Sequence, residues 1–107
     1  MKVLIIGASG MLAKPVIRHL DNAGCQLRLF SRSVHKSMFD KEYEMVQGDV
    51  FDPDDLSRAM NGCEAVHISL SNVNEASAVK SIVEIAEQKE IKLMSYVSGC
   101  TVSEENR

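Results

Sequence analysis

The stretch Met1-Lys-Val-Leu-Ile-Ile-Gly-Ala-Ser-Gly-Met-Leu-Ala13 decides the fold of this chain. Its apolar run from Val3 to Ile6 is short, is rich in β-branched residues and ends at Gly7, which is typical of a strand buried on both faces of a sheet. The residues that follow have helical spacing, with apolar side chains at Leu12, Ala13, Val16, Ile17 and Leu20. A strand that enters a helix through a glycine-rich turn presents backbone N–H groups and the positive end of the helix dipole, so we predict an anion site at this turn.

The spacing Gly-x-x-Gly-x-x-Ala indicates which anion binds there. Gly7 lets the chain turn tightly, and Gly10 lets a phosphate approach the backbone without meeting a Cβ. Ala13 is small enough for the helix to pack closely on the sheet. The motif of nucleoside triphosphatases does not fit, because its second glycine would fall at Leu12. We therefore predict a pyrophosphate held by Gly7, Ser9, Gly10, Met11 and Leu12.

Composition limits the class of protein. The 107 residues, 45% hydrophobic and 25% charged, predict one soluble globular domain over residues 1–107. A net charge of −3 with no basic cluster among aromatic residues argues against nucleic-acid binding. The first apolar run is too short to span a membrane and lacks a signal-peptide cleavage region. Three cysteines without a Cys-x-x-Cys pair predict a cytoplasmic protein with no structural disulfide, and the three histidines have no metal-ligand spacing.

Apolar strands alternate with helical stripes along the whole chain. The first helix should end at Gly24, and Asp52 should cap a second helix that ends at Asn61-Gly62. A further helix is expected over residues 75–90. The inward stripes of these two later helices are predicted to be Leu56, Ala59 and Met60, then Val79, Ile82, Val83 and Ala86. The later strands are expected over residues 26–30, 43–47, 65–70 and 91–97. This alternation predicts an α/β fold with a doubly wound parallel sheet in the order 3-2-1-4-5.

Ligands of such sheets bind outside the carboxyl ends of the strands, where the strand order reverses. A fold that prefers NAD usually has an acidic residue about 20 positions after its glycines, to bind the ribose hydroxyls. Here the second strand ends in Phe30-Ser31-Arg32, without an acid. The Arg32 guanidinium suits a 2′-phosphate, and Lys36 follows one helical turn later. We predict that NADP(H) binds more tightly than NAD(H); the alternative is that Arg32 is a solvated surface charge.

Two more segments fall on the same edge of the predicted sheet. Gly48-Asp49-Val50 ends the third strand, so Asp49 can accept a hydrogen bond from an adenine amino group while Val50 packs against the ring. The alternative is that Asp49 caps the turn before Asp52. Leu70 and Ser71 leave the fourth strand, where the ribose and nicotinamide of the cofactor would lie.

These pieces together resemble the short-chain dehydrogenase/reductase superfamily, specifically its atypical, NmrA-like and NAD(P)H-binding branch. The matching features are Gly7-Ala-Ser-Gly10-x-x-Ala13, Ser31-Arg32 with Lys36, Gly48-Asp49-Val50 with Asp52 and Leu56, Asn61-Gly62-Cys-Glu-Ala-Val66, and Ser95-Tyr-Val-Ser-Gly99. The resemblance implies that Gly7 and Gly10 bind the pyrophosphate, Arg32 the 2′-phosphate and Asp49 the adenine.

The resemblance does not extend to catalysis. Relatives that transfer hydride commonly use a Tyr-x-x-x-Lys pair, in which the lysine lowers the pKa of the tyrosine. Here Tyr43 and Tyr96 are followed four positions later by Gln47 and Cys100. We therefore assign no catalytic residue and expect the chain to be a truncated or fragmentary form of a longer reductase-like protein.

Three functions follow from this sequence as hypotheses. The first is the NADP(H)-binding domain of an NADPH-dependent oxidoreductase. The second is a non-catalytic NADP(H)-sensing module of NmrA type, which passes the redox state to a protein partner. The third is a Rossmann-like domain that binds nothing. An open sheet edge would also favour self-association into a homo-oligomer.

Overall fold

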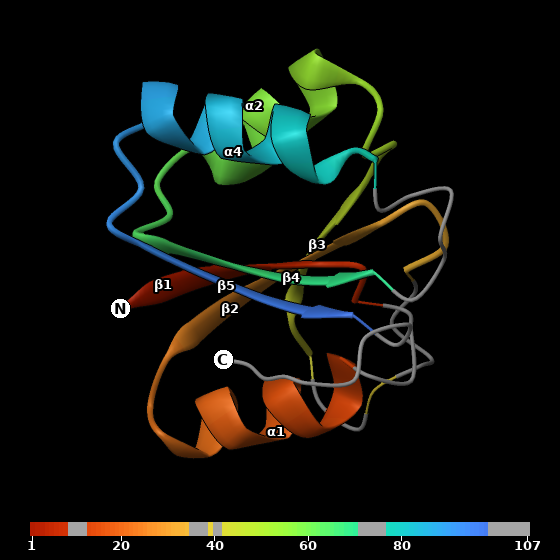
Figure 1. The fold of residues 1–107 in the computed structure, drawn as a ribbon. Helices are drawn as coiled ribbons and strands as arrows, with labels where there is room; N and C mark the ends of the chain where they lie inside the picture. Colours follow the sequence, from red (N-terminus) through yellow and green to blue (C-terminus); the bar gives the residue numbers. More distant parts are fainter. Residues whose placement is uncertain (9–12, 35–38, 40–41, 71–76, 99–107) are drawn as a thin grey trace.

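The computed structural model describes residues 1–8, 13–34, 39, 42–70 and 77–98, and these form three layers (Figure 1). The middle layer is a sheet of β1 (Lys2–Ile6), β2 (Gln26–Ser31), β3 (Glu44–Gln47), β4 (Ala65–Leu70) and β5 (Leu93–Ser98). Helix α1 (Ala13–Asn22) covers one face of the sheet. Helices α2 (Pro53–Met60) and α4 (Val79–Gln88) cover the other face.

The sheet is parallel throughout, with the strand order β3-β2-β1-β4-β5. This confirms the predicted topology. Ile6 at the end of β1 lies opposite Phe30 of β2 and Ile68 of β4, and Ser31 lies opposite Gln47 of β3. The carboxyl ends of the strands therefore form one continuous edge, which we call the carboxyl rim.

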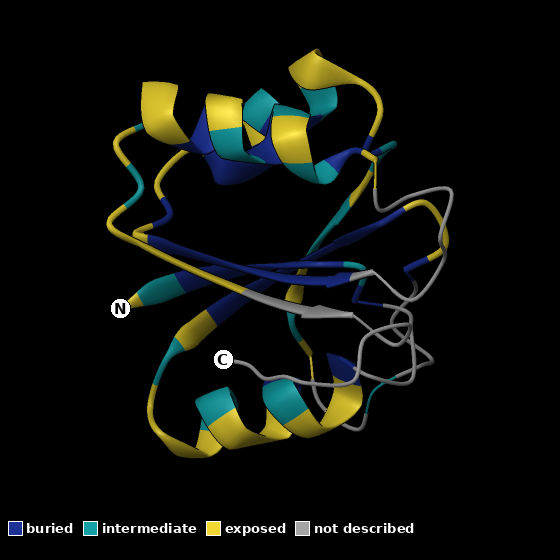
Figure 2. Cartoon of the chain, viewed as in Figure 1, coloured by how far each residue is buried: buried dark blue, intermediate teal, exposed yellow. Residues whose placement is uncertain are grey.

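The core consists of two apolar layers, one on each face of the sheet (Figure 2). Side chains alternate along β1, so that Val3 and Ile5 face α1 whereas Leu4 and Ile6 face α2 and α4. Neither face of this central strand is open to water, which explains why its sequence is an uninterrupted apolar run.

Helix α2 begins and ends where its sequence predicts. Asp52 Oδ1 accepts hydrogen bonds from the N–H groups of Asp54 and Asp55, at 2.9 and 3.4 Å, and so satisfies two donors that have no partner within the helix. Gly62 follows the helix with a φ of +83°, a conformation that a residue with a Cβ adopts only under strain. The predicted inward stripe is buried: Leu56, Ala59 and Met60.

The last helix and strand differ from the sequence prediction at their boundaries. Residues 77 and 78 form a turn, and α4 begins at Val79; residues 75 and 76 lie outside the described part of the chain. The buried residues of α4 are Ile82, Ile85 and Ala86, while Val83 is half-buried. The prediction missed Ile85 because it placed the centre of the stripe one position away.

The start of β5 is delayed by the way in which α4 ends. Glu90 adopts a left-handed conformation with a φ of +58°, and the Ile91 N–H donates to the Ala86 carbonyl at 3.0 Å. This is the bonding pattern of a Schellman cap, in which the residue after the helix turns the chain away. Ile91 is therefore bonded to the helix, and the strand begins at Leu93 rather than at Ile91.

Candidate functional site

Gly7 is the first residue after β1, and its φ of +84° carries the chain onto the carboxyl rim. Its N–H and that of Ala8 both donate to the Phe30 carbonyl, at 2.9 and 3.2 Å. These two amides are therefore used within the fold and hold the turn against β2. Ala13, the predicted close-packing position, is fully buried at the start of α1. The other predicted pyrophosphate contacts lie outside the described residues: Ser9, Gly10, Met11 and Leu12.

Arg32 directly follows β2 and is exposed at the carboxyl rim. The preceding residue, Ser31, is buried, and its Oγ accepts a hydrogen bond from the Ser33 N–H at 3.0 Å. This short turn fixes where the chain leaves the strand. Arg32 therefore lies on the carboxyl rim, where the sequence predicted it; Lys36 lies outside the described residues.

The Gly48-Asp49 segment lies beside Arg32 on the carboxyl rim. The Gly48 N–H donates to the Ser31 carbonyl at 3.2 Å, which joins the end of β3 to the end of β2. A Cβ on Gly48 would lie 2.6 Å from Cε1 and 2.9 Å from Cζ of Phe30. A glycine is therefore required here by packing.

Asp49 is held through its backbone and one of its carboxylate oxygens. Its Oδ1 accepts from the Phe51 N–H at 2.9 Å, its own N–H donates to Asp55 Oδ2 at 3.0 Å, and its carbonyl accepts from the Asp52 N–H at 3.0 Å. Asp49 therefore caps the turn before Asp52, which was the alternative to adenine binding, but it uses only one of its two carboxylate oxygens to do so. Asp49 Oδ2 accepts no hydrogen bond from any residue that the structure describes.

Val50 and Leu70 contribute differently to the rim. The Val50 side chain is only 4% exposed and packs in the core with Phe30 and Leu56. A nucleobase at this point would therefore meet mainly the backbone of Val50 rather than its side chain. Leu70 is the last residue of β4 and pairs with Ser98 in the ladder, while Ser71 lies outside the described residues.

Asp55 has a lowered pKa, chiefly because its carboxylate accepts the Asp49 N–H. Arg58 adds to this effect, since its Nη2 donates to Asp55 Oδ1 at 3.0 Å. The carboxylate is therefore kept ionised next to the loop that carries Asp49.

Arg28, a buried arginine in the middle of β2, was not among the residues predicted from the sequence. Its Nη1 donates to the carbonyls of Ala59 and Asn61 at 2.5 and 2.6 Å, so it caps the end of α2 from another element. Its Nε forms an ion pair with Glu44 Oε2 at 3.1 Å, without hydrogen-bond geometry. The sequence did hold a signal for this role, because an arginine in a strand covered on both faces needs partners.

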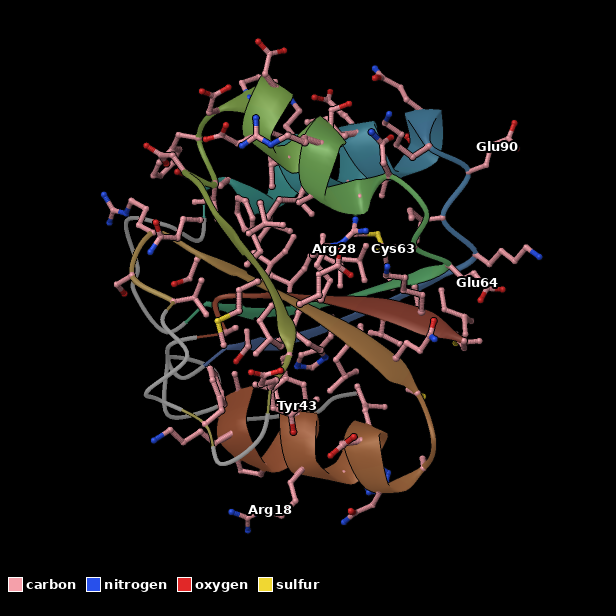
Figure 3. All side chains as sticks on the ribbon, turned by 180° about the vertical axis from the view of Figure 1, so that it is seen from behind. Arg18, Arg28, Tyr43, Cys63, Glu64 and Glu90 are labelled. Atoms are coloured by element: carbon pink, nitrogen blue, oxygen red, sulfur yellow. The ribbon has the colours of Figure 1, made fainter. Side chains whose placement is uncertain are left out.

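Cys63 and His67 are further buried groups near the sheet. Figure 3 shows Cys63 beside Arg28, between the sheet and α2, where burial raises the pKa of the thiol. His67 in β4 lies on the face that α1 covers, with Nδ1 2.6 Å from Ser95 Oγ. Burial lowers the pKa of His67, so the ring is neutral near pH 7.

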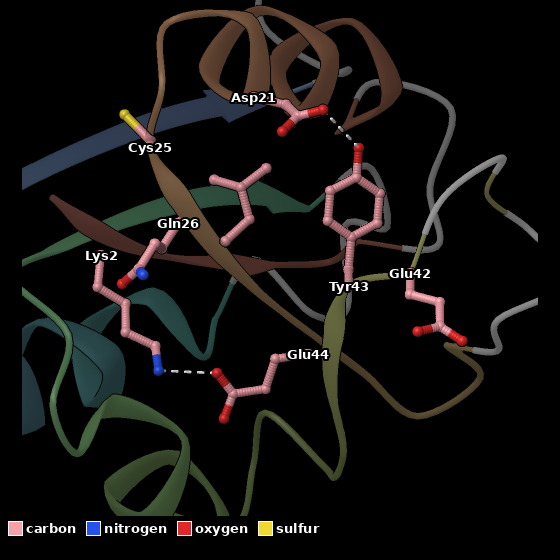
Figure 4. A pocket seen from close by; sticks show the side chains of 8 residues that line it. Lys2, Asp21, Cys25, Gln26, Glu42, Tyr43 and Glu44 are labelled. Carbon is pink, nitrogen blue, oxygen red and sulfur yellow. Dashed lines mark hydrogen bonds and ion pairs between the residues drawn. The ribbon is translucent and has the colours of Figure 1, made fainter.

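A second feature lies at the amino ends of the strands, opposite the carboxyl rim. It is an open pocket of about 330 Å³ (Figure 4). Tyr43 Oη donates there to Asp21 Oδ2 at 3.2 Å, and Lys2 Nζ pairs with Glu44 Oε1 at 2.8 Å. This pocket is therefore separate from the carboxyl rim, and four of its polar side chains are bonded in two pairs.

The parallel sheet, the glycine turn after β1 and the reversal of strand order at the carboxyl rim define a Rossmann-like fold of the dinucleotide-binding class. The chain belongs to the NAD(P)H-binding family, whose model matches residues 7–107. Among the described residues, no helix is both long enough and apolar enough to cross a membrane.

Named relatives match parts of the chain. This chain is 32% identical over 68 residues to the Photosystem II assembly factor Ycf39 of Cyanophora paradoxa. That match covers 62% of this chain and 21% of the Cyanophora protein. The chain is 34% identical over 62 residues to a 2-alkyl-3-oxoalkanoate reductase of Shewanella oneidensis, covering 58% of this chain and 16% of that protein.

A solved structure shares the fold. It is a short-chain dehydrogenase/reductase of Veillonella parvula in complex with NADP, with a TM-score of 0.74 and 24% identity. The match covers 91% of this chain and 46% of that one. The matched segments therefore cover less than half the length of each of these three proteins.

Proposed function

We propose that this chain binds NADP(H) more tightly than NAD(H), as the dinucleotide domain of an NADPH-dependent oxidoreductase. The observation that carries the proposal is the exposed Arg32 at the end of β2, beside the Gly48-Asp49 segment. An NAD-selective site needs a carboxylate at this place to accept the ribose hydroxyls. A guanidinium there favours a phosphate instead, through paired charge-assisted hydrogen bonds.

The residues on the carboxyl rim suit an extended dinucleotide. Gly7 would shape the turn while Ser9, Gly10, Met11 and Leu12 bind the pyrophosphate, because the Gly7 and Ala8 amides are already bonded to the Phe30 carbonyl. Arg32 and Lys36 would bind the 2′-phosphate, and Asp49 Oδ2 the adenine amino group. The nicotinamide end would lie toward Leu70 and Ser71. When bound, the cofactor would supply the hydride, and the residues of this chain would bind and orient the cofactor. The NADP complex of the Veillonella protein and the reductase name of the Shewanella relative support this assignment.

Calorimetric titration of the protein with NADPH and NADH tests the preference. We expect NADPH to bind about ten- to a hundredfold more tightly, because one charge-assisted contact contributes roughly 1.5–3 kcal/mol. Arg32→Ala should remove most of that difference and leave NADH binding unchanged. The matched control is Arg18→Ala, which removes an exposed arginine on the outer surface of α1 (Figure 3). Tighter binding of NADH by the unmodified chain would overturn the proposal.

The same site would also serve an NADP(H)-sensing module. The observation in favour of this second function is that neither Tyr43 nor Tyr96 is followed by a lysine four positions later. Assays of NADPH consumption with a panel of quinones and aldehydes separate the two functions. A sensor should bind the oxidised and reduced cofactors unequally and consume neither, whereas steady oxidation of NADPH would identify an oxidoreductase.

Self-association through β5 is part of the same proposal. Among the described residues this strand pairs only with β4, and its Leu93 and Met94 are 55% and 39% exposed. An unpaired strand edge with exposed apolar side chains is a template for pairing with another chain. Sedimentation should show a dimer that Met94→Lys weakens. A strict monomer at high concentration would refute self-association.

A further inference from the structure

The first turn of α2 departs from the usual pattern of helix capping. Asp55 is the third residue of the helix, where an acidic side chain ordinarily accepts the N–H of the capping residue, here Asp52. In this protein the Asp52 N–H instead donates to the Asp49 carbonyl at 3.0 Å. The Asp55 carboxylate extends past the cap, and its Oδ2 accepts the Asp49 N–H at 3.0 Å. The side chain therefore fixes the loop before the helix rather than the helix itself.

The result is that Asp49 has little freedom left. Its N–H is held by Asp55, its carbonyl by Asp52 and its Oδ1 by the Phe51 N–H. With these three groups fixed, the direction of the remaining oxygen, Oδ2, is set before any ligand arrives. Arg58 Nη2 bonds Asp55 Oδ1 at 3.0 Å and so orients the carboxylate that holds the loop.

Helix α2 itself is a firm base for this contact. At its far end Arg28 Nη1 binds the carbonyls of Ala59 and Asn61. On its inner side Leu56 is fully buried. Because the helix is anchored at its end and along its side, Asp55 is presented to the loop from a fixed place.

We propose that Asp55 is a positioning residue for nucleobase recognition, which preorganises Asp49 Oδ2 to accept the exocyclic amino group of adenine. This inference rests on the proposed function. The physical reason is that a loop ordered before binding loses less conformational entropy when the ligand arrives. Asp55 itself touches no part of the ligand and acts only through Asp49.

The test compares two ligands that differ at one exocyclic group. NADPH carries an amino group on its purine, whereas its hypoxanthine analogue carries a carbonyl oxygen, which Asp49 Oδ2 would repel. We expect Asp55→Ala to weaken NADPH binding roughly three- to tenfold and to leave the hypoxanthine analogue nearly unaffected. The ratio of the two dissociation constants is the decisive quantity, since a merely structural defect would weaken both ligands equally.

Two further variants complete the experiment. Asp54→Ala removes the neighbouring exposed carboxylate, which has no hydrogen-bond partner among the described residues, and it should keep the ratio within about twofold. Asp55→Asn keeps an oxygen that can accept the Asp49 N–H, so it should retain most of the preference. If Asp55→Ala fails to fold, Asp55→Asn is compared with Asp55→Leu instead. Each variant is then measured at the same interval below its own melting temperature.

The outcomes separate this inference from the proposed function. If the unmodified chain binds neither ligand, the proposed function itself fails. If it prefers NADPH and Asp55→Ala keeps the full preference, the positioning role is refuted while the proposed function stands. Equal loss of preference in Asp54→Ala and Asp55→Ala would show a general charge effect and would also refute the positioning role.

Discussion

The ring of Phe30 lies directly beneath Gly48, so close that a Cβ on Gly48 would lie 2.6 Å from Cε1 of that ring. The same residue binds the other side of the carboxyl rim, because its carbonyl accepts the N–H groups of Gly7 and Ala8. Phe30 is fully buried and therefore cannot yield by moving its ring into water. One residue of β2 thus supports both the turn after β1 and the loop after β3.

Gly48→Ala should destabilise the protein through this contact. A buried ring that must shift for an added methyl group costs about 1–3 kcal/mol of unfolding free energy, measured by urea denaturation. Phe30→Leu in the same chain should recover part of the loss, because it removes the clashing atoms. If the double variant shows the simple sum of the two losses, the clash is not the cause.

Asp49→Asn should separate ligand recognition from folding. The amide oxygen can still accept the Phe51 N–H. We therefore expect the free energy of unfolding, measured by urea denaturation, to change by no more than about 0.5 kcal/mol, as for a surface substitution. The amide nitrogen would now face the adenine amino group as a second donor, so NADPH should bind roughly tenfold more weakly. Calorimetry with the hypoxanthine analogue should show the opposite change. Unchanged NADPH affinity would leave Asp49 with its turn-capping role alone.

Arg28→Met should be among the most damaging single substitutions in this chain. It leaves the carbonyls of Ala59 and Asn61 without their donor, and a buried acceptor left unsatisfied costs about 1–3 kcal/mol. The exposed Glu44 carboxylate keeps its ion pair with Lys2, so losing Arg28 there adds little. Arg28→Lys should rescue little, because an ammonium lacks the planar fork that serves several acceptors at once. Urea denaturation compares these variants with Arg18→Met, which should be nearly neutral. A small loss in Arg28→Met would mean that water replaces the guanidinium.

His67 should make stability fall in mildly acidic solution. Burial lowers its pKa in the folded protein below the ordinary value of 6.5. As the pH falls below 6.5 the unfolded chain takes up a proton that the folded protein refuses, so stability declines by up to about 1.4 kcal/mol per pH unit until the lowered pKa is reached. His67→Gln can still bond Ser95 but does not titrate. Its stability should be flatter between pH 6.5 and 5 in urea titrations; parallel profiles would contradict the assignment.

Most element boundaries could be predicted from the sequence because local patterns determine them, and the alternation of strands and helices then favoured the observed strand order. The apolar run before Gly7, the Asp52 cap and the glycines after the first two helices each specify a boundary within a few residues. The start of β5 could not be predicted in this way. It depends on Glu90 adopting a left-handed conformation, which an acidic residue does not signal.

Part of the candidate site could also be predicted, because the strand order determines which residues meet. Topology alone brings Gly7, Arg32 and Asp49 to one edge, since the carboxyl ends of parallel strands share it. The bonds from Asp55 to Asp49 and from Arg28 to the end of α2 were not predicted. Each depends on where a side chain points after the elements have packed, and no spacing rule encodes that direction.

Cys63 gives the molecule an internal reporter. Its Sγ lies 3.7 Å from the Ala59 carbonyl, one of the two acceptors that Arg28 uses, and its thiol is buried with a raised pKa. Because Cys63 is buried whereas Cys25 is half-buried, we expect a thiol reagent to label Cys63 more slowly, at a rate limited by local opening between α2 and the sheet. The rate at which Cys63 is labelled therefore measures how often the helix detaches, with no probe added to the chain.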